Sequence, residues 1–305
     1  MALTIFCPAC KLAPLDSWFI KRNKHGLFPI CRCRSCHSAF VWPRPDEEKT
    51  ESFYRDSSYK NLTSEEVKRD RLIYYPTADM DASRLIDRCR RLARGRFLLD
   101  IGAGFGEFSM AAKRSGLDVV ACEPNPSSRR IFVELNHFEP ETGMFDRDLA
   151  RAYKDRFDIA LLSHVLEHAN DPEAFVDNLR LVLKDGGIAA VAVPHFGSAL
   201  SRVQGKRDMF ICPPEHLNFF SAIGLVHLFE RSGFRILYLE TVSKLNRLKI
   251  RRIVRSPLLS EWAWRGLYRV LNIADSIGWG MVLNAYFGKQ LSFPGSGGSD
   301  DSSCP

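Results

Sequence analysis

The chain has 305 residues, enough for one large domain with additions or for two domains. Hydrophobic residues make up 45% of it, as in an ordinary globular protein, and no apolar run reaches the roughly 18 to 20 residues that a membrane span needs. The net charge of +7 favours acidic partners such as phosphorylated substrates, nucleic acid or anionic lipid, although a mildly basic surface also serves solubility alone. The first ten residues lack the charged and apolar parts of a signal peptide, so we expect a cytoplasmic protein.

Cysteines cluster at the amino-terminal end, where five of the nine lie within the first 36 residues. In a cytoplasmic protein such clustering indicates a metal rather than disulfide bonds. Two C-x-x-C pairs about 20 residues apart can close a tetrahedral site of four thiolates, which makes the expected Zn²⁺ structural. The predicted ligands are Cys7, Cys10, Cys33 and Cys36. Within this domain, residues 1–45, Cys31 is the alternative to Cys33 and His37 is a weaker one, while unligated buried cysteines are the alternative to the metal.

Residues 46–95 read as a connector or lid with aromatic residues in a polar background. Apolar residues recur at helical spacing from Ala82 to Leu92, and Asp79 or Asp81 precedes them as a candidate cap. We therefore expect one or two short helices followed by this longer one.

The most informative stretch of the sequence runs from residue 97 to residue 125 and reads FLLDIGAGFGEFSMAAKRSGLDVVACEPN. An apolar run predicts a buried strand, and then come a loop with three glycines, helical spacing and a second apolar run that ends at Glu123. These are the parts of a nucleotide-binding βαβ unit, in which the terminal acid binds ribose hydroxyls. Asp100 at the first strand end would repel phosphate and attract an ammonium group, so the pattern favours S-adenosylmethionine, which has an ammonium and no phosphate. Incidental glycines in an ordinary βα turn are the alternative.

The motif LLDIGAGFG resembles the first motif of the class I S-adenosylmethionine-dependent methyltransferases, apolar-apolar-Asp-apolar-Gly-x-Gly-x-Gly, at every position. The resemblance extends almost throughout residues 97–243. It implies an α/β fold with a Rossmann-like sheet and helices on both faces, in a domain at 96–243 whose third strand falls within 136–146. The implied contacts to the cofactor are Asp100, Gly102, Ala103, Gly104, Gly106, Glu123, Pro124, Ser163 and His164.

A strand predicted at 157–162 leads into SHVLEHANDPEAF, which resembles the fourth-strand motif of this family. His164, Glu167 and His168 have i, i+3, i+4 spacing and would share one face of a helix, where they could bind a divalent cation. Quinone O-methyltransferases, which look most similar here, have an acid in place of His164. The alternative is that Glu167 and His168 cap and pack the loop.

A second stretch, PPEHLNFFS at 213–221, resembles the zinc-ribbon sugar C-methyltransferases. In that subgroup a Glu-His pair lies over the sulfonium and the histidine acts as a base. Glu215 and His216 match the pair, and histidine has a pKa suited to a base at neutral pH. Pro213 departs from the tyrosine of the subgroup, which leaves a general histidine-base interpretation. The predicted catalytic residues are His216, Glu215 and His168, with His195 as a further candidate and simple packing as the alternative for His216.

The cysteine segment also resembles a zinc-ribbon extension found ahead of bacterial sugar and natural-product methyltransferases. There, C-x-C-x-x-C runs into an aromatic stretch and Pro-Arg-Pro, as residues 31–45 do here. The resemblance implies that the extension covers the active site or holds the acceptor.

The region from 244 to 290 alternates basic and apolar residues and then carries tryptophans, which predicts basic amphipathic helices. Such helices can cover the sheet, contact an anionic membrane through residues 244–268, or bind RNA phosphates. Residues 291–305 are rich in Gly and Ser and are predicted to be disordered.

These patterns predict a methyltransferase that acts on an oxygen or carbon of a small-molecule acceptor or of a sugar linked to a nucleotide or lipid. An RNA methyltransferase is the first alternative, because zinc cysteines, basic charge and aromatics would serve it. However, SHVLEH stands where a base-holding Asn-Pro-Pro-aromatic motif would follow the fourth strand, so nucleic acid is the weaker choice. A non-catalytic binding module with this fold is the second alternative. The sequence carries no signal for the oligomeric state.

Overall fold

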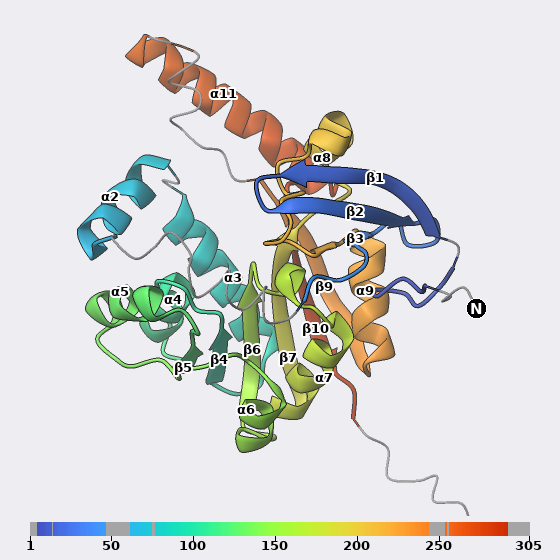
Figure 1. Cartoon of the computed structure of the whole chain (residues 1–305). Coiled ribbons are helices and arrows are strands. Elements are labelled where there is room, and N and C mark those ends of the chain that lie inside the picture. The colour runs from blue at the N-terminus through green and yellow to red at the C-terminus, as the bar shows by residue number, and fades with distance from the viewer. Residues whose placement is uncertain are drawn as a thin grey trace, which may run out of the picture.

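The computed structural model describes residues 5–13, 15–46, 62–74, 77–243, 254 and 256–291. They form a six-stranded sheet with helices on both faces and a smaller four-stranded sheet beside it (Figure 1). The α/β fold class expected from the sequence is therefore confirmed. The start of the connector, most of the basic run after residue 243 and the tail beyond residue 291 lie outside the described residues. No helix in the described ranges is long and apolar enough to cross a membrane.

The large sheet has the strand order β5-β4-β6-β7-β10-β9. Its strands are β4 (Phe97–Ile101), β5 (Asp118–Cys122), β6 (Phe157–Ser163), β7 (Leu183–Pro194), β9 (Phe234–Val242) and β10 (Val282–Lys289). The first four of these in chain order pair in parallel, with Asp100 opposite Ala121 on one side and Leu161 on the other. The carboxyl ends of β4 to β7 consequently share one edge, which is where open parallel sheets bind ligands.

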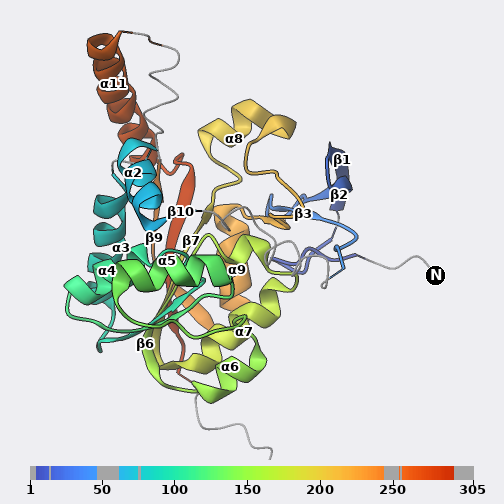
Figure 2. The ribbon, with the colours of Figure 1, turned by 60° about the vertical axis from the view of Figure 1, so that its left-hand side comes forward.

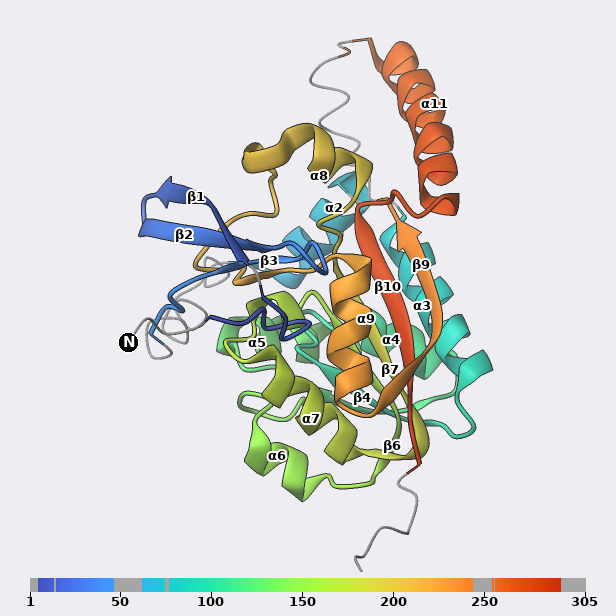
Figure 3. The same ribbon diagram turned by 90° about the vertical axis from the view of Figure 1, so that its right-hand side faces the viewer.

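Two apolar cores cover the two faces of this sheet. Alternate residues of β4 show the division: Leu98 packs with α3 and α4, whereas Leu99 packs with α7 and α9. Figure 2 shows α3 and α4 on the near face, and Figure 3 shows α7 and α9 on the other. The helices are α2 (Ser64–Tyr74), α3 (Ala78–Leu92), α4 (Glu107–Arg114), α5 (Pro126–Asn136), α6 (Arg147–Ala152), α7 (Pro172–Val182), α8 (Ala199–Gln204), α9 (Ala222–Arg231) and α11 (Pro257–Ser276), with short 3₁₀ turns η1 (Leu166–His168) and η2 (Gly205–Arg207).

Three details differ from the sequence-based expectations. Residues 282–289, expected to be helical, form β10, which inserts antiparallel between β7 and β9 and extends the large domain beyond residue 243. All eight residues of β10 are buried, so it lacks the alternation that marks a half-exposed strand. The third strand expected within 136–146 is reduced to one bridge between Cys122 and Glu141. Thr77, and neither Asp79 nor Asp81, occupies the cap position of α3.

The small sheet has the order β1-β2-β3-β8 and joins distant parts of the chain. Its strands are β1 (Leu15–Asn23), β2 (Gly26–Cys33), β3 (Ala39–Val41) and β8 (Asn218–Phe219). We call β1 to β3, their cysteine-bearing turns and the segment 42–46 that follows β3 the cysteine ribbon. Because β8 comes from the segment between β7 and α9, the ribbon is hydrogen-bonded to the large domain rather than separate from it.

Candidate active site

The glycine loop after β4 has a backbone that only glycine adopts readily. Gly102, Gly104 and Gly106 have φ values of +66°, +56° and +83°. A Cβ on Gly102 would lie 2.6 Å from Val165, and one on Gly106 would lie 2.1 Å from Asn136. A Cβ on Gly104 would meet nothing within 4 Å, so the chain there borders open space. The loop thus presents bare backbone to a ligand at the carboxyl edge of the sheet.

Asp100 is a buried carboxylate, 2% exposed, at the end of β4. It accepts a hydrogen bond of 2.6 Å from Ser109 Oγ. Burial raises its pKa to about 7. Among the described residues no lysine, arginine or histidine forms an ion pair with Asp100. An ammonium group of a ligand would favour the ionised form and offset the cost of burying it.

Glu123 closes the loop from the end of β5. Its Oε2 accepts from Gly104 N at 2.7 Å, and its Oε1 accepts from Asn125 N at 2.8 Å. Burial raises its pKa. Pro124 follows, with its carbonyl accepting from Arg129 Nη1 at 2.7 Å. Each carboxylate oxygen keeps lone-pair capacity for a further donor, such as a ribose hydroxyl.

These features fit S-adenosylmethionine. The cradle at Gly104 admits a ligand against the backbone, Glu123 is hydrogen-bonded to the Gly104 amide, and Asp100 ends the neighbouring strand. Ala103 completes the loop, and its amide donates to Cys122 O at 3.0 Å. The carboxylate of Asp100 at the strand end argues against a phosphate ligand, because it would repel the negative charge.

The end of β6 carries Ser163 and His164 at the same edge. His164 has a φ of +57°, uncommon for a residue with a side chain, and its Nδ1 lies 3.2 Å from Glu167 Oε1. The three-residue η1 turn replaces the helix that the spacing suggested, so His164, Glu167 and His168 do not share a helix face. Ligand atoms of Glu167, His168 and His216 instead lie within 4.8 Å of one another, but both ring nitrogens of His168 are hydrogen-bonded to backbone carbonyls, so this arrangement offers a metal ion no lone pair from His168.

Glu167 is the buried charge of this cluster, at 1% exposure. Burial alone would raise its pKa, but the hydrogen bond from His164 and the charges of His168 and His216 hold it at about 2. Its Oε2 has no hydrogen-bond partner in the described part of the chain. The local motif predicts only a capping or metal-binding role for Glu167, because nothing in that motif places His216 beside it.

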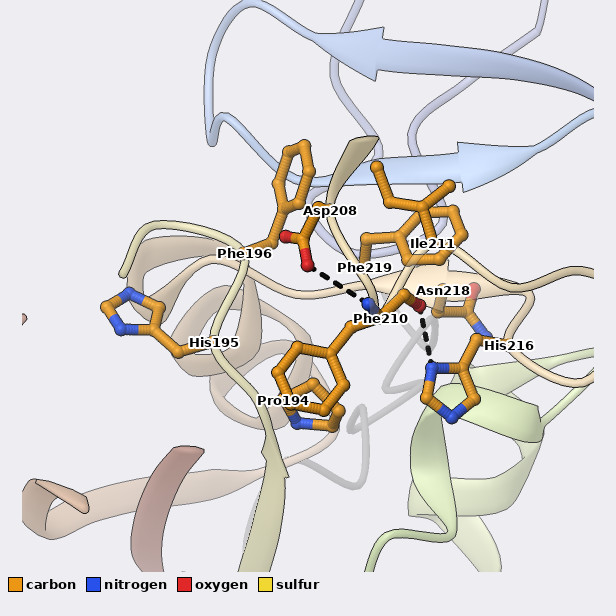
Figure 4. A pocket seen from close by; sticks show the side chains of 9 residues that line it. All are labelled: Pro194, His195, Phe196, Asp208, Phe210, Ile211, His216, Asn218 and Phe219. Atoms are coloured by element: carbon orange, nitrogen blue, oxygen red, sulfur yellow. Dashed lines mark hydrogen bonds between the residues drawn. The ribbon is translucent and has the colours of Figure 1, made fainter. Parts of the chain in front are cut away.

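His216 has one ring nitrogen engaged and one available. Its Nδ1 lies 2.8 Å from the carbonyl oxygen of Phe210, so Nδ1 carries the proton and Nε2 has the lone pair (Figure 4). Burial lowers its pKa. The ring of Phe210 stacks at 11° to it, and the ring of His168 lies 4.9 Å away. A neutral imidazole of this kind is suited to accept a proton.

The other histidines and Glu215 are placed differently from His216. Both ring nitrogens of His168 meet backbone carbonyls, Glu215 O at 2.6 Å and His164 O at 3.0 Å, so its ring links two loops. The Glu215 side chain is exposed. His195 is buried with Nδ1 3.0 Å from Gly280 O, and burial lowers its pKa. The buried carboxylate beside His216 is Glu167, and not Glu215.

A hollow lies between the end of β7 and β8, with His216 in its wall (Figure 4). We call it the acceptor hollow, and its lining residues are Pro194, His195, Phe196, Asp208, Phe210, Ile211, His216, Asn218 and Phe219. The walls are largely aromatic. The free space among them is about 10 Å³, room for about one water molecule, so these side chains would have to move apart before a sugar or an aromatic ring could contact them and His216.

Two networks join the hollow to its surroundings. Leu217 N donates to Glu167 O at 2.9 Å, and Asn218 Nδ2 donates to Ala169 O at 2.7 Å, which holds β8 against the loop after β6. From the ribbon, Arg44 donates to Leu217 O at 2.9 Å. The ribbon thus supports the segment that carries His216.

The cysteine ribbon brings together the four cysteines selected from the sequence. The Sγ atoms of Cys7 and Cys36 are 3.6 Å apart, as are those of Cys10 and Cys33, and all four residues are buried without a disulfide. Thiolates about 2.3 Å from a tetrahedral Zn²⁺ would be about 3.8 Å apart, so the cluster fits the ion. Burial, assisted by the neighbouring sulfurs, raises the pKa of Cys10 to about 11, a cost that a bound cation would remove. Cys31 lies outside the cluster.

The chain is similar in sequence to known methyltransferases. The family model described as a methyltransferase domain matches residues 77–239. A ubiquinone biosynthesis O-methyltransferase of Cereibacter sphaeroides is 40% identical over 101 residues, which cover 31% of this chain and 40% of that protein. Its counterpart from Nitrobacter winogradskyi is 30% identical over 160 residues, which cover 46% of this chain and 59% of that one. The aligned part is thus less than two thirds of either relative.

Solved structures show the same fold. The 1,6-didemethyltoxoflavin-N1-methyltransferase of Burkholderia thailandensis, solved with bound 1,6-didemethyltoxoflavin and S-adenosylhomocysteine, superposes with a TM-score of 0.52 at 14% identity, covering 85% of this chain and 98% of that one. An S-adenosylmethionine-dependent methyltransferase of Thermotoga maritima gives a TM-score of 0.50 at 18% identity, covering 74% and 96%. At these identities the likeness concerns the fold alone.

Proposed function

Because the chain belongs to the methyltransferase-domain family and has the class I S-adenosylmethionine-dependent fold, we propose that it methylates an oxygen or carbon of a small-molecule acceptor. The preferred acceptor is a sugar linked to a nucleotide or lipid, or a related compound that carries a ring. The observation that carries the proposal is the arrangement of two sites at one sheet edge. The Asp100–Glu123 cradle suits the cofactor, and the acceptor hollow carries a neutral histidine.

When bound, S-adenosylmethionine supplies a methyl group on a positively charged sulfonium. Asp100 is suited to bind its ammonium, and Glu123 is suited to its ribose hydroxyls. Ser163 and His164 follow at the neighbouring strand end. Holding donor and acceptor in contact supplies much of the rate in such a transfer.

His216 is the proposed general base. The Phe210 carbonyl fixes the proton on Nδ1, so Nε2 can take the acceptor proton as the methyl group arrives. The imidazolium formed in this way carries a positive charge close to the Glu167 carboxylate, which stabilises it. His168, held at both nitrogens, is a positioning residue in this scheme, and the exposed Glu215 has no part in the proton transfer.

The proposal is tested by incubating the full-length, zinc-loaded protein with S-adenosylmethionine and panels of sugar nucleotides, lipid-linked sugars, phenols and RNA. S-adenosylhomocysteine release is the readout. We expect turnover with one class of small acceptor, and loss of that turnover in His216→Asn. Turnover with RNA alone would replace the proposal by RNA methylation. Cofactor binding without turnover on any panel would indicate a binding module.

A further inference from the structure

Helix α11 projects from the body of the protein and is attached mainly near its carboxyl end (Figures 1 and 3). There Asp275 accepts hydrogen bonds from Ser243, at 3.0 Å from the amide and 2.7 Å from the hydroxyl. Thr241 Oγ1 also donates to Asp275 O at 2.9 Å. Most of this 20-residue helix therefore stands clear of the large sheet.

The exposed side of α11 is its apolar side. Trp262 is 76% exposed and Ile273 is 64% exposed, whereas Trp264, Tyr268 and Asp275 are partly buried. The other large exposed apolar residues of the helix are Leu258, Leu259, Leu267 and Val270. From Leu259 onward the spacing of three and four residues puts most of them on one face. A globular helix normally buries this face, so the reversal points to a partner.

A second exposed segment lies next to this helix. Helix α8 begins beside the end of α11, where Ala199 N donates to Trp279 O at 3.1 Å. Val203 on α8 is 86% exposed, and Arg202, Lys206 and Arg207 are exposed around it. Residues 199–207 contain no acid. An apolar tip is thus surrounded by positive charge.

We propose that α8, η2 and the apolar side of α11, together the α8–α11 face, dock on an anionic lipid bilayer. Tryptophan and aliphatic residues would enter the headgroup region, and Arg265 and Arg269, exposed on α11, would meet the phosphates. A second copy of this chain is a poorer occupant, because pairing two such faces would bring their arginines and lysines together. Glu261, the acid on the first turns of α11, is already paired with Arg265 at 3.2 Å.

The α8–α11 face lies close to the acceptor hollow, which relates docking to the proposed reaction. Helix α8 starts five residues beyond the end of β7, and Pro194 and His195 at that end line the acceptor hollow. A bilayer at the α8–α11 face would therefore lie at the same end of the molecule as the proposed active site (Figure 1). This corollary, that the acceptor is carried by a lipid, rests on the proposed function, whereas the docking itself does not.

The test is flotation of the full-length protein with extruded vesicles. We expect binding to phosphatidylcholine vesicles that contain about one third phosphatidylglycerol, and little binding to phosphatidylcholine alone. Ile273→Glu puts a charge in the middle of the apolar side and should lower the bound fraction at least about tenfold. Asn272→Glu adds the same charge to the adjacent exposed residue, off that side, and should keep most of the binding.

Three results would overturn the proposal. The wild-type protein could fail to float with anionic vesicles, or Ile273→Glu could float as well as Asn272→Glu. Sedimentation could instead show a dimer that Ile273→Glu dissociates, which would make a second copy the occupant. S-adenosylmethionine binding is measured on the same samples. Failure to float with intact cofactor binding rejects the docking alone, and loss of cofactor binding in the wild type rejects the proposed function.

Discussion

The two halves of the candidate active site are assembled in opposite ways. The cofactor half comes from residues 97–125, and its main contacts, such as Gly104 N to Glu123 Oε2, lie within one βαβ unit. The acceptor half combines Glu167 after β6 with His216 before β8, and the ribbon supports it through Arg44. Local geometry suffices for the first half, whereas the second exists only when segments far apart in the chain meet.

The two halves are also joined to the ribbon to different degrees. Ser38 Oγ and Ser221 Oγ are 3.2 Å apart, and Arg44 donates a hydrogen bond to Leu217 O. The ribbon is therefore hydrogen-bonded to the chain on both sides of β8. Within the described residues no hydrogen bond joins the ribbon to residues 97–125. We therefore expect that damage to the ribbon affects acceptor chemistry and spares cofactor binding.

Replacing His216 should give the largest difference between an effect on turnover and an effect on cofactor binding. We expect His216→Asn to lower kcat by about 10²–10⁴-fold, the usual contribution of a general base, with an unchanged Kd for S-adenosylmethionine. The neighbouring Glu215→Gln, at an exposed side chain, should keep kcat within about twofold. Single-turnover kinetics and calorimetry on both variants check this. Equal losses in the two variants would remove His216 from the chemistry.

We expect the next largest effect on turnover from removing a cysteine of the cluster. Cys33→Ser should lose the bound zinc, lower the thermal midpoint and reduce turnover by about tenfold or more, because the ribbon no longer holds β8. Cys31→Ser, a matched change outside the cluster, should retain one zinc per chain. Metal analysis and thermal unfolding report the first two effects. A parallel loss of cofactor affinity in Cys33→Ser would show that the halves are coupled.

The pH dependence of turnover tests the state of His216. Burial lowers its pKa below the ordinary value of about 6.5, so the base is neutral at pH 7 and becomes protonated only under more acidic conditions. The acid limb of kcat should therefore have its midpoint below pH 6.5 and fall about tenfold per pH unit beneath it. A limb centred above pH 6.5 would contradict the assignment.

The smallest effect concerns Ser109. Its hydroxyl donates to Asp100 and lowers the carboxyl pKa, although burial keeps that pKa raised overall. Ser109→Ala should raise the Asp100 pKa further and weaken S-adenosylmethionine binding about threefold to tenfold at pH 6.5. Because ionisation recovers with rising pH, the gap to the wild type should narrow by pH 8. A gap that is the same at both pH values would mean that Asp100 ionisation is not involved.

The same contrast explains how much the sequence could predict. Strands β4 and β5, the glycine loop and the cysteine pairs follow local patterns, and the structure has them where the sequence put them. The sequence did not predict strand β10, because this strand is buried on both faces and lacks alternation. It also follows helix α11, whose pattern suggested that the helical region continues to residue 290. The pairing of Glu167 with His216 was missed because 49 residues separate them and Glu215 offered a nearer carboxylate.

The most direct test of the account is calorimetric titration of S-adenosylmethionine into the zinc-loaded wild type and Asp100→Asn at pH 7.5. We expect micromolar binding by the wild type and an affinity weaker by about 10–100-fold in Asp100→Asn, since a hydrogen bond to a charged group contributes about 1.5–3 kcal/mol. Asp118→Asn, at the exposed start of β5, should bind like the wild type. Equal affinity in Asp100→Asn, or no binding by the folded wild type, would contradict the account.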